Sequence, residues 1–262
     1  LRDFCADLSR EMRAVRLMTK YQARHCMLRF STTARMTHLM RNTPLHLDGT
    51  REVTDRLDDD LRASVATYAS PASPPSLDDL GWTIAQLPCS LGGIGTPGFS
   101  GRLASAYLAA YYDVSHLWSR RLPPEHRSLF FKPCSQVAEP GEVNGEAMGT
   151  TDIPRPAWAA QGALGQISAS LGTTPKEVAD LLPDEWDKDA QHKLMHAIHE
   201  HRRQVDILTN TAVPFVRKLV HKAAEEDVYT HQSLPGNPST TIHNKAFLAY
   251  TARRTLQRFP DI

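Results

Sequence analysis

The sequence of 262 residues lacks several features that mark particular classes of protein. Its four cysteines, Cys5, Cys26, Cys89 and Cys134, lie far apart without a C-x-x-C pair, which argues against a zinc knuckle or a disulfide framework. We therefore expect a reducing compartment, either the nucleus or the cytoplasm. No apolar run approaches the roughly 18 residues of a membrane span, and no charged and then apolar leader opens the chain, so we expect no membrane partner.

Patterns typical of β-strands are equally scarce. No stretch of alternating β-branched residues is long enough for a sheet, whereas apolar residues recur at helical spacing along most of the chain. Residues 132–156 lose this spacing and contain four prolines and three glycines. The sequence therefore predicts a mainly α fold with two helical units, residues 1–132 and 157–262, joined by a Pro/Gly-rich linker over 133–156.

Acidic residues are few at the start of the chain, although the net charge of the whole is only +1. Residues 1–41 contain nine Lys or Arg and three Asp or Glu, a local charge of +6. The spacing predicts one long amphipathic helix over 4–27. Beside its apolar face it would carry a continuous cationic ridge that begins at Arg2. The ridge residues expected to contact phosphates are Arg10, Arg13, Arg16, Lys20 and Arg24. Such a ridge suits a phosphate backbone, and a plain solvated helix face is the alternative.

Further helices are expected along both predicted units. Thr174 and Glu177 form a predicted capping box around Pro175. Residues 70–76, SPASPPS, and 234–241 should be loops. A long helix should carry Ala190, Leu194, Ile198, Val205 and Leu208 on one side, and another helix should begin at Pro214. The last helix, over 242–259, contains four basic residues. The other expected helices cover residues 31–42, 53–68, 78–86, 103–118 and 175–182.

Residues 93–98, GIGTPG, match the G-x-G-x-x-G fingerprint of a dinucleotide-binding turn. That fingerprint works only between a strand and a helix, because the pyrophosphate sits on the helix N-terminus. A helix and Asp113 follow at suitable distances, but Pro88 precedes the turn where a central strand would need an N–H donor. We therefore interpret the match as a glycine-built turn between helices.

Two clusters contain residue types that coordinate metal ions in proteins. Asp58, Asp59 and Asp60 could suggest a two-metal phosphoryl-transfer site, but the neighbouring apolar spacing favours a solvated helix face. His192, His196 and His199 stand four and three residues apart, so two imidazoles could reach one zinc ion. Without a further ligand type we interpret them as an exposed polar surface, and we expect His201 in the core.

The order of motifs resembles a known family. YQARHCMLRFSTTARMTHLMRNTP at 21–44, LDDDLRASV at 57–65, LPCSLGGIG at 87–95 and SAYLAAYYD at 105–113 are similar to the region that follows the palm in non-LTR retroelement reverse transcriptases. The matching positions occur in the family's order. They are Gln22, Leu28, Arg29, Arg41, Pro44, Leu57, Asp58, the glycine turn and 106–109.

The resemblance implies a thumb and post-thumb segment that holds an RNA/DNA duplex beside an upstream palm domain. The Tyr-x-Asp-Asp motif of the palm and the family's downstream Cys/His cluster are absent from this sequence. We therefore expect no catalytic site and no cofactor in this chain, while the resemblance places magnesium in the palm of the parent polymerase. A helical protein-interaction adaptor and an inactive retroelement remnant are the alternatives.

Overall fold

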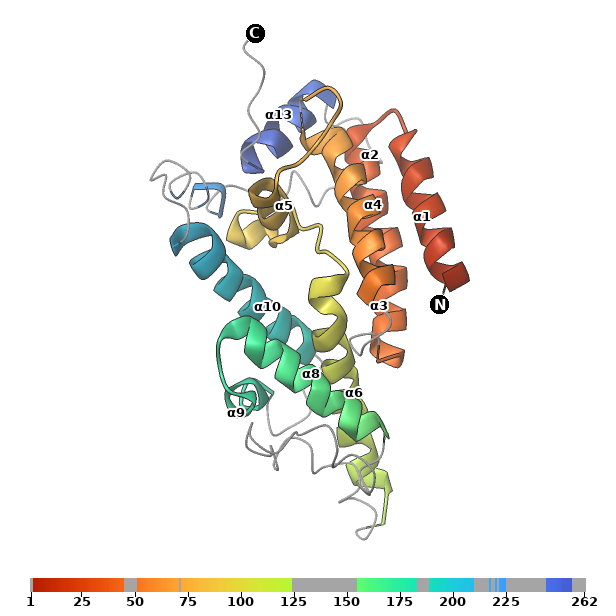
Figure 1. Ribbon diagram of the computed structural model, residues 1–262, viewed down its shortest axis with the longest axis vertical. Coiled ribbons are helices and arrows are strands. Elements are labelled where there is room, and N and C mark those ends of the chain that lie inside the picture. The colour runs from red at the N-terminus through yellow and green to blue at the C-terminus, as the bar shows by residue number, and fades with distance from the viewer. Residues whose placement is uncertain are drawn as a thin grey trace. The chain divides into compact units, whose positions relative to one another are not determined.

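The computed structural model describes residues 2–44, 51–70, 72–123, 155–182, 189–209, 217, 220, 222–224 and 244–255 (Figure 1). Helices account for most of these residues, and none of them lies in a β-strand, which confirms the mainly α fold. The chain divides into two compact units that are discontinuous in sequence. Unit 1 comprises Leu1–Thr37, Glu52–Gly101 and His199–Ile262, and unit 2 comprises His38–Arg51 and Arg102–Ile198.

The predicted linker over 133–156 falls mostly outside the described residues. Helix α8 (Arg155–Leu171) begins at the last two of its positions. The predicted boundaries at 132 and 157 therefore remain a prediction. Unit 1 nevertheless draws residues from both predicted units, because its last segment begins at His199.

Helix α1 (Arg2–Arg16) opens unit 1 with an amphipathic pattern. Its buried side chains, Cys5, Leu8, Met12 and Val15, recur every three or four residues and so occupy one face. The single helix expected over 4–27 is wrong, however, because α1 ends at Arg16 and α2 (Tyr21–Cys26) begins after a corner at 17–20. Lys20 has an extended backbone there, with φ −97° and ψ 117°.

The corner is stabilised by a residue far away in the sequence. Asn244 donates from Nδ2 to the carbonyl oxygen of Thr19 at 2.6 Å and accepts from the Tyr21 N–H at 3.0 Å. It thereby satisfies one of the N–H groups that the first turn of α2 leaves without an intrahelical partner. Because Asn244 follows Tyr21 by 223 residues, no local pattern could have located the corner.

Helix α2 runs on into the π-helix η1 (Met27–Thr32) and then into α3 (Thr33–Asn42). The end of α3 at Asn42 confirms the expected stop before Thr43-Pro44, where proline disfavours helical geometry in the preceding residue. Beside α1 lies α4 (Arg51–Ala69) (Figure 1). Its buried residues confirm the expected inner face, and they include Leu57, Leu61, Val65 and Tyr68.

Two further elements complete the described part of unit 1. Helix α5 (Asp79–Gln86) begins where expected, with the Asp78 carboxylate accepting from the Gly81 N–H at 2.7 Å. Helix α13 (Asn244–Arg254) lies within the expected 242–259 and contacts α2. The α13 side chains that pack inward are Phe247, Thr251, Ala252 and Arg254.

Unit 2 is built around α6 (Leu103–Arg121), which packs against α8, and α8 packs in turn against α9 (Pro175–Ala179). Leu108, Leu164 and Leu194 are almost fully buried in its core. The capping box at Thr174 and Glu177 is confirmed. Helix α8 was not predicted, since a segment rich in Ala, Gly and Ser gives only a weak apolar pattern.

Helix α10 (Ala190–Arg202) continues into a second π-helix, η5 (Arg203–Thr209). The sequence predicted one regular helix here, with Val205 on its apolar side. That prediction is wrong, because a π-helix has more residues in each turn and rotates the following side chains. Val205 is exposed and Ile207 is buried instead.

Candidate nucleic-acid interface

Arg10 and Arg13, two of the predicted phosphate partners, lie on α1 and each has a carboxylate nearby. Arg10 pairs with Asp7 one turn earlier, and Arg13 Nη1 lies 3.9 Å from Asp60 Oδ2. Their side chains are 73% and 56% exposed. Both arginines are therefore on the surface, and a carboxylate partly neutralises the charge of each. Such exposed ion pairs contribute only about 0–1 kcal/mol to stability.

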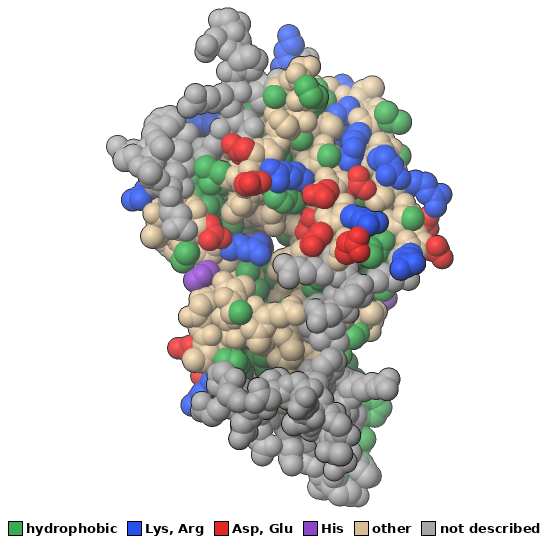
Figure 2. Space-filling view, viewed as in Figure 1, with side chains coloured by type: hydrophobic (Ala, Val, Ile, Leu, Met, Phe, Trp, Pro, Cys, Tyr) green, Lys and Arg blue, Asp and Glu red, His purple; other side chains and the backbone are tan. Residues whose placement is uncertain are grey.

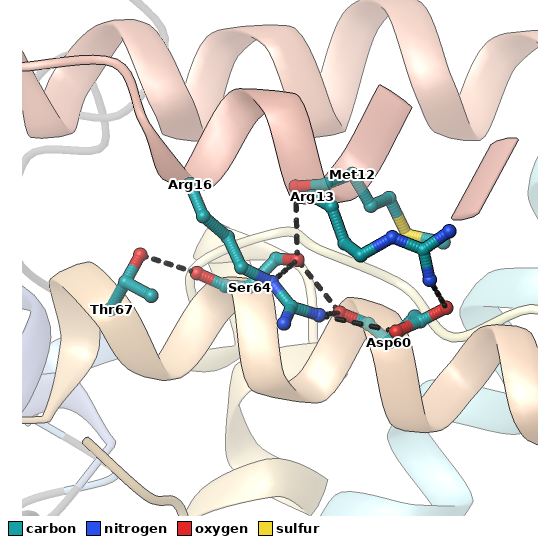
Figure 3. A network of polar contacts seen from close by, with 6 residues as sticks. All are labelled: Met12, Arg13, Arg16, Asp60, Ser64 and Thr67. Atoms are coloured by element: carbon teal, nitrogen blue, oxygen red, sulfur yellow. Dashed lines mark hydrogen bonds and ion pairs between the residues drawn. The ribbon is translucent and has the colours of Figure 1, made fainter. Parts of the chain in front are cut away.

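Arg16 points toward α4 (Figure 3). Its Nε donates to Ser64 Oγ at 2.9 Å, and its Nη2 donates to the Asp60 carbonyl oxygen at 2.8 Å and lies 3.3 Å from the Asp60 carboxylate. The Ser64 hydroxyl donates to the same carbonyl at 2.7 Å. Arg16 therefore joins α1 to α4, and its donors are engaged inside unit 1.

Lys20 and Arg24, the other two predicted partners, lie beyond the corner. Lys20 is exposed at the N-cap of α2. Arg24 Nε donates to the Met18 carbonyl oxygen at 2.6 Å, and its guanidinium carbon lies 4.9 Å from the Tyr21 ring centroid. Burial lowers the pKa of Arg24, although a guanidinium stays protonated in proteins. A continuous ridge on one helix is therefore wrong, because the corner separates α1 from these two cations.

Arg29, on η1, extends to the glycine turn. Its Nη1 lies 3.9 Å from Cys89 Sγ, and its guanidinium carbon lies 5.1 Å from the Phe30 ring centroid. A β-carbon at Gly95 would lie 3.0 Å from that guanidinium carbon, and Gly95 has a φ of +71°. Glycine at 95 therefore both permits the turn and leaves room for Arg29.

Lys20, Arg24 and Arg29 form a set that we call the α2–η1 cations. In the described part of the chain, no Asp or Glu lies within ion-pair distance of any of them. Elsewhere on unit 1, Figure 2 shows basic and acidic side chains interleaved on the visible face. Sequence reasoning missed Arg29 as a site residue. The available signal was that residues 21–42 contain four arginines and no acid.

The glycine turn is not a dinucleotide site. A 3-10 helix, η2 (Cys89–Leu91), precedes Gly93 where a strand would be needed, and another, η3 (Ser100–Arg102), separates the turn from α6. The N–H groups of Gly93 and Gly95 already donate to the carbonyl oxygens of Pro88 and Leu87, at 3.1 and 2.9 Å. They are therefore not available to a pyrophosphate.

Arg254 of α13, one of the basic residues expected on the last helix, is buried against this turn. Its Nη1 donates to the Gly93 carbonyl oxygen at 2.6 Å and its Nη2 to that of Ala223 at 2.6 Å. Its Nε donates to the Tyr250 hydroxyl at 3.0 Å. The backbone carbonyl dipoles therefore stabilise the buried charge. The same carbonyl oxygens accept hydrogen bonds from guanidinium N–H groups that burial would otherwise leave without partners.

The acidic trio on α4 is divided between different contacts. The Asp58 carboxylate accepts from the N–H groups of Phe99 and Ser100 at 2.5 and 2.9 Å, and Asp60 holds Arg16. The expectation of a fully solvated trio therefore holds for Asp59 only. Among the residues that the structure describes, no three His, Cys, Asp or Glu side chains are grouped to hold a metal ion.

The three spaced histidines do not share one exposed side. His192 and His196 are exposed, with ring centroids 6.3 Å apart, but His199 is only 5% exposed. His201, expected in the core, is half-buried. Periodicity alone failed here because burial depends on which elements pack beside each turn.

The positions that carry the retroelement resemblance contribute to packing. Gln22, Leu28, Leu57 and all four residues at 106–109 are buried. Arg41 donates to the Asp113 carboxylate at 2.5 Å and to the Gln191 side chain at 2.6 Å within unit 2. These motif residues therefore contribute to packing or to contacts within a unit.

Comparisons of the chain with family models, with curated proteins and with solved structures give no match. No helix in the described ranges is both long and apolar enough to cross a membrane. The three described cysteines, Cys5, Cys26 and Cys89, are buried free thiols.

Proposed function

We propose that this chain is a non-catalytic, nucleic-acid-gripping segment of a non-LTR retroelement reverse transcriptase. It would act in the nucleus or cytoplasm beside an upstream palm domain that binds the catalytic magnesium. One observation carries the proposal: the α2–η1 cations present positive charge that no described carboxylate neutralises. The resemblance in motif order supports the same reading.

The charges decide which predicted partners contribute most. A phosphate that approaches Arg10 or Arg13 also meets Asp7 or Asp60, whose repulsion offsets much of the attraction. Arg16 is turned inward. Lys20 and Arg24, together with Arg29, attract phosphates without that opposition, and each phosphate they neutralise releases counterions. The grip on an RNA/DNA duplex therefore centres on the α2–η1 cations.

The test is the salt dependence of binding to a labelled RNA/DNA hybrid duplex, measured by fluorescence anisotropy. A triple variant, Lys20→Gln with Arg24→Gln and Arg29→Gln, should shallow the slope of log affinity against log salt by about 2 to 3. Circular dichroism checks that the variant remains folded.

The matched control removes three cations that have carboxylate partners in the same unit, Arg10→Gln with Arg13→Gln and Arg35→Gln. The net charge change is identical, and we expect a clearly smaller change in slope. Equal changes in slope from both variants would mean that cations with carboxylate partners contribute as much to binding as the α2–η1 cations do. Unchanged slopes in both variants would overturn nucleic-acid binding by this surface.

A protein-interaction adaptor is the second candidate, and one observation favours it. Leu17 at the corner is 83% exposed, and a large apolar side chain beside Lys20 suits a docking contact. Leu17→Ser would weaken such a contact but leave the salt slope for the duplex unchanged. The adaptor would be favoured if the affinity of the chain for duplex did not depend on salt and if its affinity for a protein partner fell in the Leu17→Ser variant.

A further inference from the structure

Phe30 is an apolar ring held at the surface of unit 1. It lies on η1 and is 49% exposed. π-helical segments are rare and are frequent at functional sites, because the extra residue redirects side chains. Here the segment that presents Phe30 also presents Met27, which is 39% exposed.

The orientation of the ring is restrained by Arg29. The guanidinium carbon stands 5.1 Å from the ring centroid, and Nη1 of the same group is held near Cys89 Sγ. The space that Gly95 leaves open accommodates this guanidinium. A cation over the ring adds an attraction of about 0.5–1 kcal/mol at exposed sites, which favours a fixed orientation of the ring.

A second ring on the same helical run has the same kind of partner. The Arg24 guanidinium carbon lies 4.9 Å from the Tyr21 ring centroid, and the Tyr21 N–H is held by Asn244. Two aromatic residues, each with an arginine against it, therefore lie along α2 and η1. Interleaved aromatic and basic side chains are the combination that binds unpaired bases and their phosphates.

We propose that Phe30 is a stacking platform for an unpaired base, so that this surface binds single-stranded nucleic acid as well as duplex. The proposal rests on the proposed function for its phosphate contacts, which the α2–η1 cations supply. Bases within a duplex are stacked on one another and cannot lie on the ring, whereas a single strand can place one there. Charge complementarity favours this occupant over a protein, because the Arg29 guanidinium lies against the ring and no carboxylate in the described part of the chain pairs with it.

The test compares Phe30→Leu, which keeps apolar area but removes the ring, with Phe30→Tyr, which keeps the ring. The probe is a single-stranded RNA of about 16 nucleotides. Phe30→Leu should weaken binding roughly tenfold, since one stacked base contributes about 1–3 kcal/mol. Phe30→Tyr should bind as the wild type does, and neither variant should change duplex affinity or its salt slope.

Two controls separate the base from other contacts. An abasic strand of the same length should bind the wild type and Phe30→Leu equally, because it offers phosphates without bases. Leu17→Ala removes an exposed apolar side chain from the nearby corner and should leave single-strand affinity unchanged.

Equal affinity of Phe30→Leu and wild type for the intact strand would overturn the stacking platform. So would a Leu17→Ala loss as large as that of Phe30→Leu, which would point to a general apolar patch suited to a protein. Either result would leave the grip on duplex standing, provided that the triple cation variant still shallows the duplex salt slope. Absence of salt-dependent binding to both probes would instead overturn the proposed function itself.

Discussion

The cations of α1 (Arg10, Arg13 and Arg16) and the α2–η1 cations lie close in sequence, and all but Arg29 fall in one predicted stripe, yet the fold gives the two sets opposite surroundings. Arg10, Arg13 and Arg16 each meet a carboxylate on α1 or α4. Arg24 and Arg29 meet a carbonyl oxygen, two rings and a thiol, and Lys20 is exposed. None of the three pairs with an acid in the described part of the chain. The neighbouring helix, more than the cation itself, therefore decides whether a positive charge stabilises the fold or remains available to a ligand.

The interior of unit 1 adds a second contrast. It accepts the charge of Arg254, because backbone carbonyl oxygens surround the guanidinium. It disfavours a charge on His25, which is packed with Tyr68 and Phe247. Burial, and to a lesser degree Arg29, lowers the pKa of His25 to about 3. A buried positive charge is thus tolerated only where the backbone has been arranged to accept it.

The largest effect should come from Arg254→Met, which removes the interior cation and the guanidinium donors to the carbonyl oxygens of Gly93 and Ala223. We expect the free energy of unfolding to fall by about 3 kcal/mol or more in urea denaturation. The exposed Arg2→Met on α1 should change it by less than about 0.5 kcal/mol. Similar stabilities for the two variants would refute the account of Arg254 as a carbonyl-bound structural cation.

The next effect concerns pH. In the unfolded chain His25 takes up a proton near its ordinary pKa of 6.5, whereas in the folded chain it does so only near pH 3. Between these values the unfolded state binds more protons, so stability falls as the pH falls, by about 1.4 kcal/mol per pH unit. This amounts to about 2 kcal/mol between pH 6.5 and 5.

His25→Gln should make the free energy of unfolding depend less steeply on pH between 6.5 and 5, as measured by urea denaturation at several pH values. The variant should also be less stable than the wild type at pH 7. The exposed His192→Gln is the matched control and should keep the wild-type slope. If both variants followed the wild-type slope, His25 would be protonated in the folded chain, and the contrast with Arg254 would fail.

The smallest effect compares two α1 cations directly. Arg16→Met should lower the free energy of unfolding by about 1–2 kcal/mol, because it breaks half-buried hydrogen bonds to α4. Arg10→Met should change it by less than about 0.5 kcal/mol, since its pair with Asp7 is exposed. Equal changes in the free energy of unfolding would mean that the hydrogen bonds of Arg16 to α4 do not stabilise the fold.

The sequence predicted what local periodicity and local chemistry determine. The buried face of α4, the short helix α5, the capping box at Thr174 and the stop at Asn42 depend on neighbours within a few residues. It also predicted that the glycine fingerprint forms a turn between helices, because Pro88 is incompatible with a central strand.

The failures all involve partners that are distant in sequence or a change of helical period. The corner at 17–20 needs Asn244, and the inward turn of Arg16 needs Asp60 and Ser64. The two π-helices shift side chains away from the wheel that a regular helix predicts, which exposed Val205. For the candidate site, the residue types were predictable, but which cations stay unpaired depended on tertiary packing.

The contacts of α13 have a consequence for how the protein is synthesised. Asn244 stabilises the corner between α1 and α2 by hydrogen bonding, and Arg254 stabilises the glycine turn in the same way. Neither early segment can make these contacts before α13 has been synthesised. A ribosome delivers those early segments long before α13, because residues emerge in order at about 5–20 per second. The nascent chain must therefore hold the α1–α2 corner without its Asn244 contacts while the 223 residues that separate Tyr21 from Asn244 are synthesised.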